Sequence, residues 1–213
     1  VNGKRIDPKM YREGYLASAI KNPEVKMTFS RAGKEVEVKL HTVTYAQVKN
    51  WLYNEWEDTN RALVDRLGDG QIAYTHMRDM GSEELNEFLK DMHTRTLGKK
   101  AIIIDLRYNN GGNVHNEVLE FLSQKAHYQW AYRDFPSNSH PNVTPGDIPI
   151  IALVNERSLS DAEVTSNGIQ TLGLATIVGT ETYRWIIFTS GTTLLDGSYL
   201  RLPAWGCYSL DGK

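Results

Sequence analysis

Apolar and polar residues alternate in two short runs near the start of the chain, at 25–29 and 36–40. This period of two is typical of half-buried β-strands, whose successive side chains point to opposite faces. The stretch 31–34 between them contains Gly33, as a tight turn favours. The two runs therefore predict a β-hairpin, and the pattern of residues 14–20 before it predicts a short helix.

A helical period follows over residues 45–67. Apolar side chains recur there near one face, among charged residues: Val48, Leu52, Trp56 and Leu63. Such a stripe predicts an amphipathic helix that packs against neighbouring modules. The helix is expected to end at 68–70, where two glycines flank an aspartate.

From residue 71 onward, strand and helix patterns alternate. We predict strands at 71–77, 101–106, 148–154 and 174–179, and helices at 82–92, 114–122 and 160–172. The runs at 101–106 and 148–154 are almost continuously apolar, which favours strands buried on both faces of a sheet. Alternating β and α units predict an α/β fold with a mainly parallel sheet and flanking helices.

Local signals complete this prediction. Ser82, followed by two glutamates, is expected to be the N-cap of the helix at 82–92. Residues 185–205 predict further strands that turn at Gly191 and again at 196–197. The stretch 135–146 is rich in Pro, Asn and Ser and predicts a loop.

Two polar segments, at 105–112 and 155–163, each follow a predicted buried strand and lead into a helix. Ligands of open α/β sheets bind at the carboxyl ends of strands, so both segments are candidates for a site. The adjacent Gly111 and Gly112 can expose backbone N–H groups to a negatively charged oxygen, as an oxyanion hole does. Two glycines alone, however, favour a plain connector.

The second segment places Ser160 at the start of a helix. Free N–H groups and the helix dipole favour negative charge there, and a serine that attacks a carbonyl creates such a charge. Ser160 and Glu163 also fit the S-x-x-E capping box, and taken alone the segment favours that structural role. The two segments together, an anion-receiving turn and a helix-start serine on one sheet, point to acyl chemistry.

Both segments resemble the motifs of one peptidase family. Residues 105–112 are similar to the D-[LV]-R-x-N-x-G-G segment of C-terminal processing and tricorn-type serine peptidases, and residues 155–163 to their nucleophile segment. Residues 70–80 resemble the first core strand of the tricorn branch, and 154–179 continue the match. Residues 1–44 look like the second half of a PDZ domain.

The resemblance implies a crotonase-like core with a PDZ-like module in front. The domain organisation we predict is a partial PDZ-like module at 1–44, a helical linker at 45–69, and a serine peptidase core at 70–213 that is incomplete at its C-terminus. The chain is therefore expected to be a fragment of a longer bacterial or archaeal peptidase.

The same resemblance assigns roles to residues. It makes Ser160 the nucleophile and the N–H of Asp161 one oxyanion donor, with the second donor at Gly111 or Gly112. It implies hydrolysis of a peptide or unfolded polypeptide through an acyl-enzyme, without a metal or an organic cofactor. It also leaves room for a homo-oligomer.

The chain departs from the C-terminal processing branch at the general base. The lysine of that branch corresponds to Trp185, and the neighbouring Arg184 stays protonated and cannot act as a base. The tricorn branch uses a histidine that precedes the PDZ domain and a glutamate that follows the core, and both are expected to fall outside this chain. A serine hydroxyl needs such a base to become a competent nucleophile.

An internal histidine is the other source of a base. His115, just after the glycine turn, is the most interesting candidate, whereas His76 is expected to lie in the core or on the sheet surface. The remaining histidines are His41, His93, His127 and His140. Two other functions stay open: a non-catalytic peptide-binding fragment or pseudoenzyme, and an acyl-CoA enzyme, for which no nucleotide contacts are recognisable.

Composition removes several other classes. A net charge of −2 over 213 residues gives no electrostatic case for nucleic acid or an anionic membrane surface. No apolar run is long enough to insert in a bilayer, and the first residues lack the apolar region of a signal peptide. The single Cys207 excludes an internal disulfide and a cysteine-cluster metal site, and leaves the compartment, exported or cytoplasmic, open.

Overall fold

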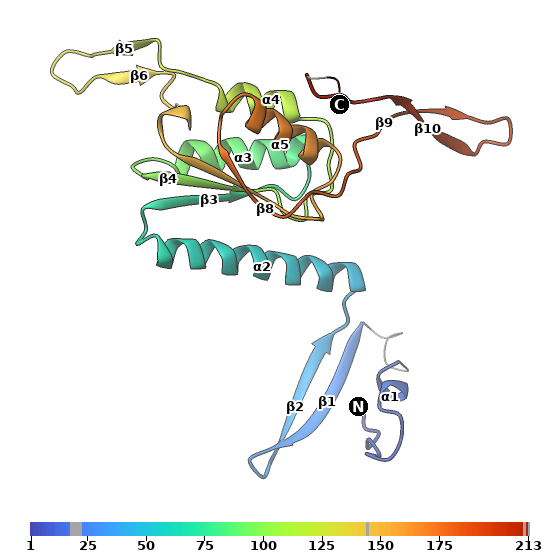
Figure 1. The fold of residues 1–213 in the computed structure, drawn as a ribbon. Helices are drawn as coiled ribbons and strands as arrows, with labels where there is room; N and C mark the ends of the chain where they lie inside the picture. Colours follow the sequence, from blue (N-terminus) through green and yellow to red (C-terminus); the bar gives the residue numbers. More distant parts are fainter. Residues whose placement is uncertain (18–22, 144, 211, 213) are drawn as a thin grey trace. The chain divides into compact units, whose positions relative to one another are not determined.

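The computed structural model describes residues 1–17, 23–143, 145–210 and 212 (Figure 1). The chain divides into two compact units, Val1–Trp56 and Glu57–Lys213, which we call unit 1 and unit 2. The division falls within the helix predicted at 45–67. Each unit is described by itself below.

Unit 1 contains the predicted hairpin. Strands β1 (Glu24–Arg31) and β2 (Lys34–His41) pair antiparallel, and the turn residues Ala32 and Gly33 have φ of 52° and 77°. Positive φ at both central positions is the turn geometry that matches the twist of a hairpin. Helix α1 (Glu13–Ala17) covers the start of the helix predicted at 14–20, and residues 18–20 of that prediction lie outside the described residues.

Helix α2 (Tyr45–Leu67) begins in unit 1 and confirms the helix predicted at 45–67. Its start is fixed by a reciprocal pair: the N–H of Gln47 donates to Thr44 Oγ1 (3.2 Å), and the N–H of Thr44 donates to Gln47 Oε1 (2.8 Å). No residue of α2 is buried, and the packing of its apolar stripe against neighbouring modules stays a prediction.

Unit 2 is built on a four-stranded parallel sheet with the strand order β3-β4-β7-β8. Helices α3, α4 and α5 connect its strands and lie on one side of it in Figure 1. These seven elements confirm the predicted α/β fold with a parallel sheet. Their bounds are β3 (Ile72–His76), α3 (Ser82–Thr94), β4 (Ala101–Asp105), α4 (His115–Leu122), β7 (Ile150–Val154), α5 (Asp161–Thr171) and β8 (Thr176–Gly179).

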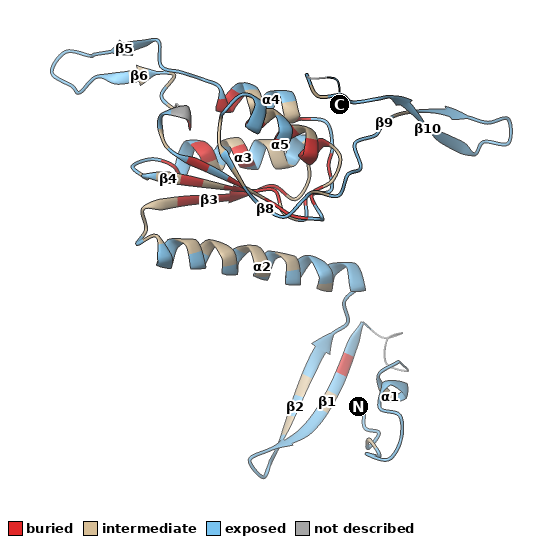
Figure 2. Ribbon diagram, viewed as in Figure 1, coloured by how far each residue is buried: buried red, intermediate tan, exposed pale blue. Residues whose placement is uncertain are grey.

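The hydrophobic core lies between this sheet and its helices, where Figure 2 shows most of the buried residues. Alternate side chains of a strand face the core: Ile102 and Ile104 are at most 1% exposed. On the neighbouring strand β7, Ile151 is 39% exposed. The expectation that both apolar strands are buried on both faces is therefore wrong, because helices α3 to α5 cover one face.

Three local predictions are corrected. Gly191 does not form a turn but lies inside β9 (Phe188–Thr193), which pairs antiparallel with β10 (Tyr199–Trp205) around the predicted turn at 196–197. The stretch 135–146 is not all loop, because β6 (Asn138–His140) pairs with β5 (Tyr128–Trp130) and a 3₁₀ turn covers Pro145–Asp147. Gly81, not Ser82, is the N-cap of α3.

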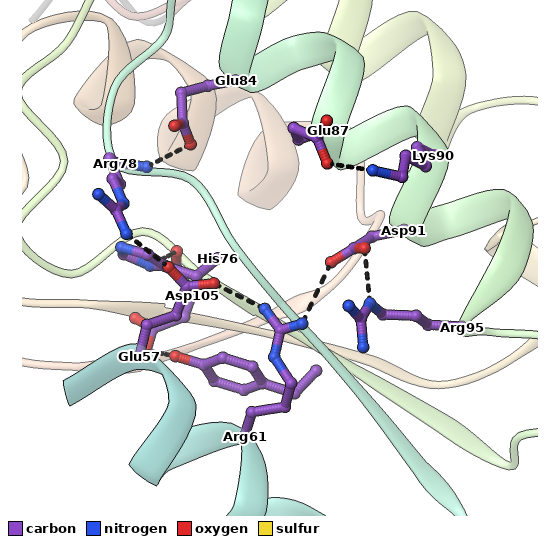
Figure 3. Close-up of polar contacts among 11 residues, drawn as sticks. Glu57, Arg61, His76, Arg78, Glu84, Glu87, Lys90, Asp91, Arg95 and Asp105 are labelled. Atoms are coloured by element: carbon purple, nitrogen blue, oxygen red, sulfur yellow. Dashed lines mark hydrogen bonds and ion pairs between the residues drawn. The ribbon is translucent and has the colours of Figure 1, made fainter. Parts of the chain in front are cut away.

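Ion pairs join α2, the connection after β3, and α3 within unit 2 (Figure 3). Glu57 accepts from Arg61 at 2.6 Å and from Arg78 at 3.2 Å, and Asp91 accepts from Arg95 at 2.6 Å and faces Arg61 at 3.8 Å. We call these five residues the paired face. Each carboxylate there lies between two guanidinium groups, so the network links the second half of α2 to the edge of the sheet.

Candidate active site

The two polar segments that follow β4 and β7 meet at the carboxyl edge of the sheet. The N–H of Leu159 donates to the carbonyl of Asn109 (2.9 Å), and the hydroxyl of Ser158 donates to the carbonyl of Leu106 (2.8 Å). Asn155 Oδ1 also accepts from the N–H of Tyr108 (3.1 Å). The structure thus brings the glycine turn and the serine segment together, although 47 residues separate Tyr108 from Asn155.

The first segment is anchored by the buried carboxylate of Asp105, which is 0% exposed. Arg107 pairs with it through two nitrogens, Nε at 2.9 Å and Nη2 at 2.6 Å, and the Tyr74 hydroxyl donates to it at 2.7 Å. Burial raises the pKa of Tyr74, and the neighbouring Asp105 charge raises it further, so the phenol stays protonated as a donor. Arg107 thereby neutralises the Asp105 carboxylate, and these hydrogen bonds fix the start of the segment 105–112.

The side chain of Asn109 fixes the conformation of the glycine turn through hydrogen bonds. Its side chain is fully buried, and its Nδ2 donates to the carbonyl of Met77 (2.9 Å). Its Oδ1 accepts from the N–H of Gly111 (2.8 Å). The N–H of Gly111 is therefore occupied within the turn.

Gly112 differs from Gly111 in this respect. The carbonyl of Gly111 accepts from the N–H of Met80 (2.9 Å), and the trans peptide directs the N–H of Gly112 to the opposite side. This N–H has no acceptor among the described residues. A Cβ at Gly112 would lie 2.1 Å from the carbonyl oxygen of Met80, so this position excludes any side chain.

The glycine turn packs directly on Ser160. Gly111 has φ of +78°, and a Cβ built there would lie 2.7 Å from the Cβ of Ser160 and 3.1 Å from the N of Asp161. Only glycine allows so close an approach, and φ in this region favours it as well. The glycine pair is thus required by the packing of the site and is more than a flexible connector.

Ser160 itself has a strained backbone, with φ of 50° and ψ of −112°. A positive φ is uncommon for a residue with a side chain, and such strain concentrates at functional sites. Ser160 ends the connection from β7 and is the N-cap of α5, so the first turn of that helix opens beside it. The N–H of Asp161, in that turn, has no acceptor among the described residues.

Glu163 holds Ser160 in this conformation. Its carboxylate accepts from the N–H of Ser160 at 2.9 Å, the pairing expected of the capping box. It also accepts from three donors of a later segment: the Thr182 hydroxyl (2.8 Å) and the N–H groups of Arg184 (2.7 Å) and Trp185 (2.9 Å). This buried carboxylate therefore joins the serine to the segment 182–185.

His115, the internal candidate for the base, is engaged with another group. Its Nδ1 lies 2.5 Å from Asp161 Oδ1, and its backbone N–H donates to Asp161 Oδ2 at 3.1 Å. The Asp161 side chain is 3% exposed, so this pair ties the starts of α4 and α5 together. No hydrogen bond joins Ser160 to any histidine of the described residues.

A cavity of about 500 Å³ opens above Ser160. We call it the serine cavity. Trp185 lines it with an indole that cannot accept a proton at neutral pH. The other walls are Asn110, Gly111, Gly112, Leu159, Ile187, Thr189, Arg201 and Pro203.

Two features of this site were missed by sequence reasoning. The S-x-x-E spacing indicated that Glu163 caps the helix, but its three other donors lie about twenty residues away. Arg201 and Thr189 carried no motif signal, because a two-stranded hairpin brings them to the cavity. His76, expected in the core or on the sheet surface, is buried at 7% exposure and lies outside the cavity.

Other kinds of site find little support in the part of the chain that the structure describes. No three His, Cys, Asp or Glu side chains come together there in a way that could hold a metal ion. Within the same residues, no helix combines the length and the apolar character needed to cross a bilayer.

Comparisons with known proteins agree with this geometry. The tricorn protease of Thermoplasma volcanium is 32% identical over 157 residues, which cover 71% of this chain and 15% of that protein. The tricorn protease homolog 1 of Streptomyces coelicolor is 27% identical over 207 residues, which cover 95% of this chain and 19% of that protein. The chain thus spans less than one fifth of the length of these relatives.

A solved structure gives the same result for the fold. The crystal structure of the tricorn protease superposes with a TM-score of 0.72 and 26% identity, over 88% of this chain and 18% of that chain. The family model described as "Peptidase family S41" matches residues 70–213, which contain the sheet, the glycine turn and Ser160. The chain therefore belongs to peptidase family S41.

Proposed function

We propose that this chain supplies the nucleophile and the oxyanion hole of a serine peptidase, with Ser160 as the nucleophile. The observation that supports the proposal is the close approach of Gly111 to Ser160, whose backbone is strained. The N–H groups of the adjacent Gly112 and Asp161 have no acceptor among the described residues. Membership of the S41 family supports a peptide bond as the scissile bond.

The oxyanion donors we propose are the N–H groups of Asp161 and Gly112. The N–H of Gly111, the other candidate from the sequence, already donates to Asn109, so Gly112 is the better donor. Each such donor contributes about 3 kcal/mol to stabilisation of the transition state. The carbonyl of Gly111 accepts from the N–H of Met80, so the trans peptide directs the N–H of Gly112 away from that bond and leaves it available to an oxyanion.

The reaction we propose proceeds through an acyl-enzyme. Ser160 Oγ attacks the scissile carbonyl, a base takes the hydroxyl proton, and the two N–H groups hold the resulting oxyanion. Collapse of the tetrahedral intermediate breaks the C–N bond, and the base returns its proton to the leaving amine. Water then attacks the acyl-enzyme and releases the new carboxylate, so no metal or organic cofactor is required.

The base in this proposal is a histidine from a segment outside residues 1–213. Two observations support this: His115 is held by Asp161, and no described histidine bonds to Ser160. The resemblance agrees, since it aligns Trp185 with the lysine of the C-terminal processing branch. We further propose that residues 70–213 form a crotonase-like core, incomplete at its C-terminus, after a partial PDZ-like module at 1–44 and a linker at 45–69. A homo-oligomer, which the resemblance allows, stays a prediction.

The test is chemical labelling of Ser160 in the full-length protein and in the fragment 1–213. A fluorophosphonate probe is expected to label the full-length protein at Ser160, and Ser160→Ala to reduce peptide hydrolysis by about 10³-fold or more. Full hydrolysis by the Ser160→Ala protein would overturn the proposal. As a control, Ser139→Ala changes a serine on the β5–β6 hairpin and should leave both readouts unchanged.

A second function is favoured because no histidine of the described residues bonds to Ser160. If the full-length protein carries no base near Ser160, the same edge binds a peptide without cleaving it. Absence of fluorophosphonate labelling in the full-length protein, together with saturable binding of peptides, would favour this peptide-binding function.

A further inference from the structure

One charged side chain in the serine cavity has no counter-ion. Of the described residues that line the cavity, Arg201 alone carries a charge. No carboxylate of the described residues lies within ion-pair distance of its guanidinium, whereas Arg61, Arg78, Arg95, Arg107 and Arg184 each pair with one.

The hairpin β9–β10 holds Arg201 in place. Its Nε donates to the hydroxyl of Thr189 at 2.7 Å, across the two strands. Gly191 lies directly opposite Arg201 in the register, and Thr189 lies diagonally opposite on the same face. The Nε hydrogen bond fixes the plane of the guanidinium and leaves its two Nη groups without a partner among the described residues.

The other walls make a carboxylate the ligand that fits this cation. Leu159, Trp185, Ile187 and Pro203 present apolar surface around it, and no acidic side chain lines the serine cavity. The Arg201 side chain is exposed, so a carboxylate can reach its guanidinium from solvent. The two free Nη groups can bind both oxygens of a carboxylate in a planar, bidentate pair.

We propose that Arg201 is a specificity residue that binds a carboxylate of the peptide, close to the scissile bond. The proposal rests on the function proposed above, because it assumes that a peptide lies in the serine cavity. The carboxylate has two sources, an aspartate or glutamate side chain or the free C-terminus, and the chemistry of recognition is the same for both. The contact between Arg201 and the carboxylate determines which peptide binds, and Arg201 takes no part in the acyl-transfer steps.

The experiment measures kcat/KM of the full-length protein on matched peptides. One series places Glu, Gln or Lys at each position flanking the scissile bond, and a second compares a free C-terminus with an amidated one. We expect one carboxylate to raise kcat/KM by about tenfold or more over its neutral counterpart. The series that shows the effect identifies the source of the carboxylate.

Three variants test the residue itself. Arg201→Gln should abolish the preference for the carboxylate, and Arg201→Glu should reverse it in favour of Lys. Thr189→Val, which removes the acceptor for Nε, should weaken the preference to an intermediate value. Arg133→Glu, an exposed arginine on the β5–β6 connection outside the cavity, should leave the preference unchanged.

The outcomes separate this inference from the proposed function. Hydrolysis that survives Ser160→Ala overturns the function, whatever the charge preference. Hydrolysis that depends on Ser160 but shows the same charge preference in the wild type and Arg201→Glu overturns only the role of Arg201. Fluorophosphonate labelling of each variant checks that the site is intact, and peptide binding to the Ser160→Ala protein gives the same comparison without turnover.

Discussion

The paired face and the serine cavity are both polar regions of unit 2, but their charged side chains have different partners. On the paired face, each carboxylate lies between two arginines (Figure 3). At the serine site, the buried Glu163 is met by neutral donors, and Arg201 is met by a hydroxyl. The ion pairs of the paired face connect secondary-structure elements. Glu163 and Arg201 have no ion-pair partner among the described residues: Glu163 holds the strained backbone of Ser160, and Arg201 is available to a ligand.

The difference has a physical basis. A carboxylate between two guanidinium groups keeps its charge because their attraction offsets the cost of removing it from water. Glu163 instead accepts four hydrogen bonds, three of them from backbone N–H groups whose positions it thereby fixes. The comparison thus predicts that changes at the cavity affect activity first and that changes on the paired face affect stability first.

After loss of the nucleophile itself, the largest effect is expected from Glu163→Ala. Loss of the carboxylate frees the N–H groups of Ser160 and Trp185, and misplacement of the nucleophile by about 1 Å reduces kcat by about 10²-fold. KM should change little. Glu163→Gln keeps one carbonyl acceptor, so its kcat should lie between the values of the wild type and of Glu163→Ala. The measurement is steady-state kinetics of the full-length protein. Glu156→Ala, an exposed carboxylate on the same connection, is the control.

A drop in thermal midpoint for Glu163→Ala with an unchanged kcat would contradict the positioning role. It would show that the carboxylate only caps the helix. Fluorophosphonate labelling rates provide the same comparison without a substrate, since they depend on the placement of the Ser160 hydroxyl.

On the paired face, Asp91→Ala should lower the free energy of unfolding by about 2 kcal/mol, because it leaves Arg61 and Arg95 without their shared carboxylate. Urea unfolding measures the change, and kcat per folded molecule should stay at the wild-type value. Asp58→Ala, an exposed aspartate of α2, is the matched control. An equal loss of stability in both variants would contradict the role of the pairing.

His76 makes stability depend on pH near the paired face. Burial lowers the pKa of its imidazole, Arg78 lowers it further, and the charges of Asp105 and Glu57 offset part of this. The unfolded chain therefore binds the proton more tightly, so the free energy of unfolding falls as the pH drops below the unfolded pKa of 6.5. The contribution of His76 to the free energy of unfolding is constant above that pH.

The variant His76→Asn removes the titrating group and keeps a donor for the carbonyl of Asp105, which His76 Nδ1 contacts at 2.8 Å. Urea unfolding above and below this pH should show a weaker pH dependence than in the wild type. An unchanged pH dependence would assign the effect to another group.

The smallest effect is expected for Glu87→Ala. The side chains of Glu87 and Lys90 are 66% and 64% exposed, and an exposed pair contributes less than about 0.5 kcal/mol. The difference from the wild type should vanish at high salt, where the charges are screened. A loss as large as that of Asp91→Ala would contradict the distinction between exposed and enclosed pairs.

Much of the fold could be predicted because its signals are local. The continuous apolar runs at 101–106 and 148–154 indicated strands, although helices cover only one face of them, and the alternation with helical patterns indicated parallel pairing. Gly191 was misassigned as a turn because the sequence shows a glycine but not its partner. In the structure it lies opposite Arg201 across a hairpin.

The candidate site was predictable only as two separate segments. Their shared position at strand ends followed from the chain order, but the contact between Gly111 and Ser160 did not. The assignment of Gly112 over Gly111 depended on which N–H is already bonded to Asn109. Such a choice rests on distances of a few tenths of an ångström, which no residue pattern encodes.

The sequence by itself determined the parallel α/β fold, the glycine turn and the serine at a helix start, because each follows from hydrophobic period or local backbone preference. Only the tertiary structure decided that Glu163 joins Ser160 to residues 182–185 and that Arg201 lines the serine cavity. These relations depend on side chains that pack together from separate elements. Their partners are therefore fixed by the folded chain and not by spacing along it.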